Sequence, residues 1–198
     1  MHPTSDFRVE DEGVLLSQLA ARPLVILAAI WAGRPLVAHA PVVVRRLSAG
    51  LALDFHLSRG NALAPALAIG VQAVAVSLAA DAYISPDWYK SADQVPTWNY
   101  VSVEAEGSVE PLDEAGLIAL LDDLSAQEEA RLAPKAAWTR AKMSAGRFEA
   151  MLRGIVGGRM RIERLEGTSK LSQNKDDADR AGVIAALGDH PIADLMPR

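Results

Sequence analysis

A succession of short apolar segments separated by turn residues is the feature that most limits the folds open to this chain. Four such segments follow one another, at 23–30, 35–46, 50–57 and 71–79. Their lengths and their Gly, Pro and polar flanks favour strands over helices. A fifth segment, 96–107, alternates strictly between two faces, as a half-buried strand does. Consecutive strands joined by tight turns pair antiparallel, so the sequence predicts an antiparallel barrel.

Helical patterns surround these strands. Acidic residues begin several of them, where the helix dipole favours negative charge, and Gly188 is placed to end the last one. The fold class expected is α+β, mainly β, in one domain over residues 1–198 with helical C-terminal elements around 113–157 and 175–187. The individual segments expected are helices at 9–22, 112–130, 144–157 and 175–189, a short helix after 58–62, and a further strand at 159–167.

Composition excludes several classes of site and of location. The chain has no cysteine, which rules out disulfides, thiolate metal sites and cysteine nucleophiles. The polar, acidic start lacks the layout of a signal peptide. Residues 60–80 carry no formal charge, but alanine, Pro65 and several polar residues make them a poor membrane span. We therefore expect a cytoplasmic protein that does not bind membranes.

Charge is distributed unevenly along the chain. Residues 1–130 carry 7 basic and 17 acidic side chains, whereas residues 131–175 carry 11 basic and 3 acidic ones, a local net charge of +8. The basic block at 140–170 would suit an anionic partner such as DNA. It would equally suit ion pairs with the acidic part of the same chain.

The segment "FHLSRGNA" (55–62) delivers His56, Ser58, Arg59 and Asn61 from a strand end to the start of a helix. A hydroxyl, a guanidinium fork and free backbone N–H groups are what a phosphate needs. The structural alternative is a helix cap beside a solvated arginine.

Two further segments bear polar groups suited to a ligand. "VAHAP" places His39 before Pro41, which cannot donate to a strand ladder and so indicates an edge or a break. His39 and His56 could coordinate a metal or a haem. No carboxylate or third histidine accompanies them, which makes a metal site a weak prediction. "KLSQN" brings Lys170, Gln173 and Asn174 between a strand and a helix, where they suit helix capping or hydrogen bonding to a heterocycle.

The segment "YISPDWYKSADQVPTWNY" (83–100) holds five of the ten aromatic residues. Trp98 and Tyr100 share one face of the expected strand, and Asn99 lies on the other. Stacking on a planar ligand and packing over the core are both open to these rings. The chain has no GxSxG, P-loop, HExxH or Rossmann glycine motif.

Three of these segments, "YISPDWY", "VPTWNYVSV" and "LEGTSKLSQNKDDADRAGVIAAL", resemble the PaiB-like family of FMN-binding negative transcriptional regulators. "PLVAHAP" and "FHLSRGNA" are similar to further segments of that family, in the same order. The resemblance covers about residues 10–187. It departs from the family where Ala64–Pro65 replaces a tryptophan position, where "IVGG" replaces "IVGF", and where "TSK" replaces "KWK".

The resemblance implies a flavin-binding split β-barrel, related to pyridoxamine phosphate oxidases, that holds FMN at a homodimer interface. By this analogy the phosphate would lie at His56, Ser58, Arg59 and Asn61. The flavin edge would lie along the strand that carries His39, Ala40 and Pro41. The departures would leave a smaller pocket wall. The cofactor-binding residues predicted are His39, Ala40, Pro41, His56, Ser58, Arg59, Asn61, Trp98, Asn99, Lys170, Gln173 and Asn174.

Three functions are consistent with this resemblance. The first is an FMN-binding transcriptional repressor, whose regulatory role is implied by the resemblance alone. The second is a small FMN-dependent oxidoreductase, for which the sequence offers no clear acid or base beyond His39 and His56. The third is a haem-binding protein, because related split barrels bind haem.

Overall fold

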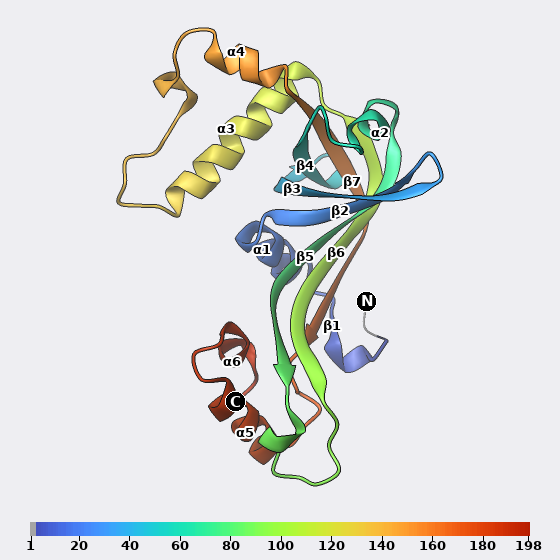
Figure 1. Ribbon diagram of the computed structural model, residues 1–198, viewed down its shortest axis with the longest axis vertical. Helices are drawn as coiled ribbons and strands as arrows, with labels where there is room; N and C mark the ends of the chain where they lie inside the picture. The colour runs from blue at the N-terminus through green and yellow to red at the C-terminus, as the bar shows by residue number, and fades with distance from the viewer. Residues whose placement is uncertain (1–2) are drawn as a thin grey trace. The chain divides into compact units, whose positions relative to one another are not determined.

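The computed structural model describes residues 3–198 and consists mainly of antiparallel strands with helices on their faces (Figure 1). The strands are β1 (Arg8–Val9), β2 (Leu24–Trp31), β3 (Arg34–Leu47), β4 (Gly50–Ser58), β5 (Val71–Ile84), β6 (Thr97–Pro111) and β7 (Ile155–Lys170). The α-helices are α1 (Glu12–Ala21), α2 (Ala64–Ile69), α3 (Glu114–Ala130), α4 (Arg147–Leu152), α5 (Asp177–Leu187) and α6 (Pro191–Leu195). Short 3-10 turns occupy Ser5–Phe7, Pro86–Trp88 and Arg140–Lys142.

The strands form one seven-stranded sheet in the order β1-β7-β4-β3-β2-β5-β6, and β6 pairs with β7 as well. The pairings that run from β7 through β4, β3, β2, β5 and β6 therefore return to β7. This close pairing depends on Gly107, because a Cβ there would lie 1.8 Å from the backbone oxygen of Arg161. Only glycine permits the two strands to approach so closely.

The chain divides into two compact units, each described by itself. One comprises the residues up to Arg22 together with Val76–Glu104 and Leu165–Arg198, and the other comprises Pro23–Ala75 and Ala105–Arg164. We call them the terminal unit and the central unit. Strands β5, β6 and β7 each continue from one unit into the other.

In the central unit, alternation along the strands separates a buried core face from a second face that α3 partly covers. Leu53 and Phe55 of β4 are fully buried with Met160 of β7 on the core face. On the second face, Val43 of β3 packs with α3 and α4 in a cluster that includes Leu117, Leu120 and Leu152. These contacts place α3 over β3 and β4 (Figure 1).

In the terminal unit, α5 and α6 pack with the ends of the long strands. Their apolar cluster comprises Ala82, Ile84, Tyr89, Val101, Leu171, Val183, Ile192 and Met196. Helix α1 begins at a cap in which Asp11 accepts a hydrogen bond from the amide of Val14 at 2.9 Å. Gly188, with φ of 57°, ends α5 as predicted, and its N–H donates to the carbonyl of Ile184.

Most predicted elements are present, and the main error lies at 144–157. The expected helix is confined to α4, and strand β7 already begins at Ile155. Pairing of Ile155 and Val156 with the end of β4 decides this, because ladder hydrogen bonds outweigh the weak local helix preference of β-branched residues. Residues 60–80 form α2 and part of β5, and within residues 3–198 no helix is long and apolar enough to cross a membrane.

Candidate functional site

The end of β4 turns sharply before α2, and local hydrogen bonds shape the turn. The hydroxyl of Ser58 accepts from the amide of Gly60 at 3.3 Å, and its carbonyl accepts from the amide of Asn61 at 2.9 Å. The side-chain oxygen of Asn61 accepts from the amide of Leu63 at 2.9 Å. Helix α2 begins at Ala64, so the predicted loop entering a short helix is present, and Asn61 closes the loop rather than capping the helix.

Arg59 fixes this turn to the start of β7. Its Nε donates to the carbonyl of Arg153 at 2.9 Å and its Nη2 to the carbonyl of Ile155 at 3.1 Å. Its backbone amide donates to the carbonyl of Gly154 at 2.8 Å. Within residues 3–198 no carboxylate pairs with Arg59, and its Nη1 makes no hydrogen bond. The guanidinium is therefore held in place without a carboxylate partner.

Arg59 lines a cavity of about 680 Å³ in the central unit. The walls are largely apolar and come from α2, α3, α4 and the first residues of β7, with Leu67, Leu117 and Phe148 among them. Arg140 and Arg153 also line this cavity, together with Glu114 and Glu149. The cavity thus joins an apolar body to charged groups of both signs, and Arg59, which has no carboxylate partner within residues 3–198, is the group in it suited to an anion.

The glycine pair in "IVGG" leaves no gap in the core. A Cβ on Gly158 would lie 2.7 Å from the ring of Phe55, which stands opposite it on β4. A Cβ on Gly157 would lie 3.0 Å from a side-chain carbon of Leu112. The ring of Phe55 therefore fills the space beside position 158, and the smaller pocket wall expected from this departure is not found there.

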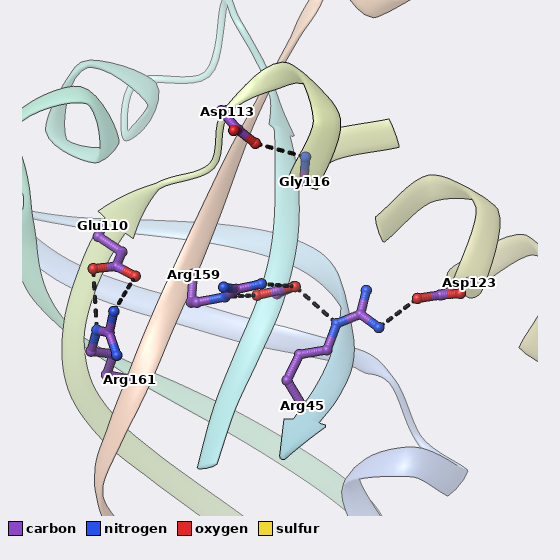
Figure 2. A network of polar contacts seen from close by, with 8 residues as sticks. Arg45, Glu110, Asp113, Gly116, Asp123, Arg159 and Arg161 are labelled. Atoms are coloured by element: carbon purple, nitrogen blue, oxygen red, sulfur yellow. Dashed lines mark hydrogen bonds and ion pairs between the residues drawn. The ribbon is translucent and has the colours of Figure 1, made fainter. Parts of the chain in front are cut away.

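A buried carboxylate at the centre of β4 joins three elements of the central unit (Figure 2). Asp54, 1% exposed, accepts from Nε and Nη2 of Arg159 at 2.6 and 2.8 Å and from Nε of Arg45 at 2.9 Å. Arg45 in turn donates to Asp123 of α3 at 2.5 Å. The two arginines neutralise Asp54, and the chain of ion pairs fixes α3 to the sheet.

The basic block on β7 is engaged with acidic residues of the same chain. Arg161 binds Glu110 at 2.8 Å, as Figure 2 shows, and Arg164 binds Glu106. Arg159 likewise binds Asp54. Of the two interpretations of the basic block, an anionic partner or ion pairs within the chain, these three arginines of β7 fit the second.

His56 lies apart from the Arg59 cavity and lines a smaller one of about 310 Å³. Its Nδ1 is buried and has no hydrogen-bond partner among residues 3–198. Burial lowers the pKa of the His56 imidazole, because an apolar environment disfavours the charged form. The structure thus places His56 and Arg59 on different cavities, and the predicted binding of one phosphate by His56, Ser58 and Arg59 stays a prediction.

Pro41 stands where β3 changes its partner. Residues up to Pro41 pair with β2, and those from Val42 pair with β4, so the predicted break in the ladder is present within a continuous strand. Ala40 is fully buried, whereas His39 is exposed opposite Ile26. His39 and Pro41 share the face of β3 whose other half carries Val43 and Arg45 toward α3.

The remaining predicted site residues lie in the terminal unit. The amide of Asn99, fully buried, donates to the hydroxyl of Ser172 at 3.0 Å, and Nζ of Lys170 donates to the hydroxyl of Thr97 at 2.6 Å. Gln173 bonds to the carbonyls of Asp6 and Ser169 and to the amide of Leu171. Burial and the charge of Lys175 lower the pKa of Lys170.

Asn174 is exposed, and Asp176, not this cluster, caps α5. The structure uses Asn99, Lys170 and Gln173 as internal contacts, and their binding to a cofactor stays a prediction.

The aromatic segment folds over the core of the terminal unit. Asp179 of α5 accepts from the amides of Lys90 and Ser91 at 2.6 and 2.9 Å and from the Ser91 hydroxyl at 2.5 Å. The Ser91 hydroxyl and amide hold the pKa of Asp179 below its usual range. Tyr89 is buried in the core cluster, while Tyr83 and Trp98 meet edge to face, 46% and 53% exposed. Tyr89 of this segment therefore belongs to the core, whereas Tyr83 and Trp98 form an exposed aromatic pair.

The family described as "Putative FMN-binding domain" matches residues 1–164. The chain belongs to this family. Among its curated relatives is "Protease synthase and sporulation protein PAI 2" of Bacillus subtilis, 29% identical over 155 residues, which cover 78% of this chain and 73% of that protein. An uncharacterized protein of Aspergillus fumigatus is 32% identical over 52% of this chain and 46% of its own length. The predicted membership of the FMN-binding, PaiB-like family is confirmed.

Solved structures confirm the split-barrel fold of this FMN-binding family member. A FAD- and haem-binding protein from Mycobacterium smegmatis matches with a TM-score of 0.60 and 22% identity, covering 92% of this chain and 81% of that one. The flavocytochrome Anf3 from Azotobacter vinelandii matches with a TM-score of 0.57 and 20% identity, covering 91% and 78%. At these identities the likeness establishes the fold.

The family match ends at residue 164, so it includes the Ser58–Arg59 turn, the β3 segment and Trp98, and ends before Lys170. Neither Asp54 nor Asp179 of this FMN-binding family member was predicted from the sequence as a residue of the site. Asp54 had a usable signal, since it is the one charged residue in the otherwise apolar alternation of 50–57. Asp179 had none, because helix-start acids are common.

Proposed function

We propose that this protein binds FMN with the phosphate at Arg59. The observation that carries the proposal is a guanidinium fixed by two backbone carbonyls, free of any carboxylate within residues 3–198, at the wall of a 680 Å³ cavity. Fixed Arg donors suit phosphate because a charge-assisted bond forms without first ordering the side chain. The hydroxyl of Ser58 adds a donor beside it, since its accepted bond from Gly60 leaves the O–H free.

Replacing Arg59 with alanine is expected to weaken FMN binding about ten- to hundredfold, because one charge-assisted contact contributes about 1.5–3 kcal/mol. Flavin fluorescence titrations of both proteins measure this. Riboflavin, which lacks the phosphate, should bind both with similar affinity. Arg147→Ala is the matched control, because Arg147 is exposed at the start of α4 and does not line the cavity. Equal FMN affinities of wild type and Arg59→Ala would remove Arg59 from the site.

We further propose that two copies of the chain pair through the hairpin of β2 and β3. Leu24, Ile26 and Ile30 of β2 and Val37 of β3 are 64%, 40%, 71% and 61% exposed. They share one face, because residues directly opposite in an antiparallel pair point the same way. Covering such an apolar face is what a homodimer interface would do.

The regulatory role is supported by charge on the segment 131–153. It carries six basic side chains and one acidic one, a local net charge of +5. Three of the basic residues, Arg131, Lys135 and Arg140, form ion pairs with α3. Arg147 and Arg153 have no carboxylate partner within residues 3–198, unlike the arginines of β7. We therefore place DNA binding on 131–153, a narrower and earlier segment than the 140–170 block predicted from sequence.

Arg147→Glu is expected to weaken DNA binding at low salt and to reduce the slope of log K against log salt by about 1 or more, since each phosphate contact contributes about −0.9. A gel-shift series over several salt concentrations measures this. The control is Arg34→Glu, the same charge change on an exposed residue outside 131–153. An equal effect of both variants would show general charge repulsion, and no shift of wild type at any salt would remove the regulatory role.

A further inference from the structure

The smaller cavity of the central unit has its own polar group, and it shares Arg140, Phe148, Leu152 and Ile155 with the larger cavity. It lies among α3, α4 and the residues between them, and His56 reaches it from β4. Alternation along β4 puts Asp54 and His56 on one face, and Asp54 is joined through Arg45 to α3. His56 therefore lies on the α3 side of the sheet, away from the buried core formed by Leu53 and Phe55.

The imidazole of His56 is the unsatisfied group in this cavity. Its Nδ1 is buried and finds no partner among residues 3–198. Burial lowers its pKa, so the ring is neutral at neutral pH and carries one donor and one acceptor nitrogen. A buried polar atom without a partner is unfavourable, and a molecule that supplies the missing hydrogen bond removes that cost.

The remaining lining carries no net charge. Arg140 pairs with Asp122 at 3.2 Å, and its guanidinium also lies 5.1 Å above the ring of Phe148. Ser125 adds a hydroxyl from α3. Apolar side chains, among them Trp138 and two methionines that adapt readily to different shapes, make up most of the rest. The volume of about 310 Å³ is at the small end of ligand sites.

We infer that this cavity binds a small uncharged aromatic molecule whose single polar atom hydrogen bonds to His56 Nδ1. The neutral lining disfavours charged ligands, because a buried charge needs a partner. The aromatic and methionine walls favour a flat ring. This cavity adjoins the one proposed for FMN, with which it shares four lining residues, but His56 lines only the smaller cavity and Arg59 only the larger one.

Two probes test the inference, 4-fluorophenol and fluorobenzene, which differ in one hydroxyl group. In ¹⁹F NMR titrations of the full chain we expect saturable binding of 4-fluorophenol, about two- to tenfold tighter than fluorobenzene, the range of one neutral hydrogen bond. In His56→Phe the two probes should bind alike. His190→Phe, the same change at an exposed histidine that does not line the cavity, should keep the wild-type ratio.

A second variant keeps the test valid if His56→Phe does not fold. Ser125→Leu adds bulk on the α3 wall and should abolish binding of both probes. Non-saturable binding, a probe ratio of 1 in wild type, or unchanged affinity in Ser125→Leu would overturn the inference. The titrations are repeated in saturating FMN, where unchanged probe affinity is expected. Displacement of the probe by FMN would assign the cavity to the flavin site instead, and this arm is separate from whether FMN binds at Arg59.

Discussion

Asp54→Asn is expected to lower the free energy of unfolding by about 3 kcal/mol, the lower end of the range for a broken buried ion pair. The change keeps the shape of the side chain but removes the charge that Arg45 and Arg159 share. The two guanidinium groups are only 22% and 25% exposed, so water compensates them incompletely. Asp123 remains near Arg45, which is why we expect the lower end.

Urea denaturation monitored by circular dichroism measures this difference. The control is Glu110→Gln, which breaks the ion pair with Arg161 in the same unit. Both of those side chains are more than 40% exposed, so that change should cost less than about 1 kcal/mol. If the free energy of unfolding of Asp54→Asn lies within about 0.5 kcal/mol of the wild-type value, as expected for an exposed pair such as the control, the network in Figure 2 adds little to stability.

A third variant separates the cost of broken pairing from the value of the network. Replacing Arg45 and Arg159 with methionine and Asp54 with leucine removes every charge at the centre together. Buried ion networks replaced by apolar side chains often retain stability. We therefore expect this triple variant to be more stable than Asp54→Asn, because the single variant alone leaves uncompensated charges.

The succession of strands could be predicted because each strand has its own local pattern. The period of two in 50–57 and the turn residues between segments belong to the sequence itself. The end of α4 could not be predicted in this way, because Ile155 and Val156 form a strand only by pairing with Ser58 and Leu57. Local propensity is a weak signal, and contacts distant in sequence override it.

The candidate site was predicted in its residue types and less well in its grouping. Ser58 and Arg59 share a turn as expected, but His56 lines a different cavity from Arg59, because β4 ends at Ser58 and the alternation of the strand no longer directs Arg59. Asn61 and Gln173 have the polar groups of a ligand site, but their side-chain oxygens accept hydrogen bonds from nearby backbone amides, those of Leu63 and Leu171. Sequence cannot separate these uses, because the same donors and acceptors serve both.

The dimer proposed through β2 and β3 gives the second large expected effect. Changing Ile30 and Val37 together to glutamate should raise the dimer dissociation constant at least about a hundredfold, because each unpaired charge buried in an interface costs about 2–5 kcal/mol. Both side chains are more than 60% exposed in the single chain, so the fold of each copy should be unaffected. A standard interface of about 1,200–2,000 Å² would be lost.

Light scattering at micromolar concentration measures the mass of each protein. Leu132→Glu is the control, since Leu132 is 55% exposed and follows α3 in the sequence, outside the two hairpin strands. We expect a dimer for wild type and for the control, and a monomer for the double variant with an unchanged melting temperature. A monomeric wild type would contradict the dimer itself. A double variant that stays dimeric would move the interface off this hairpin, and the exposed pair of Tyr83 and Trp98 would be the next apolar surface to test.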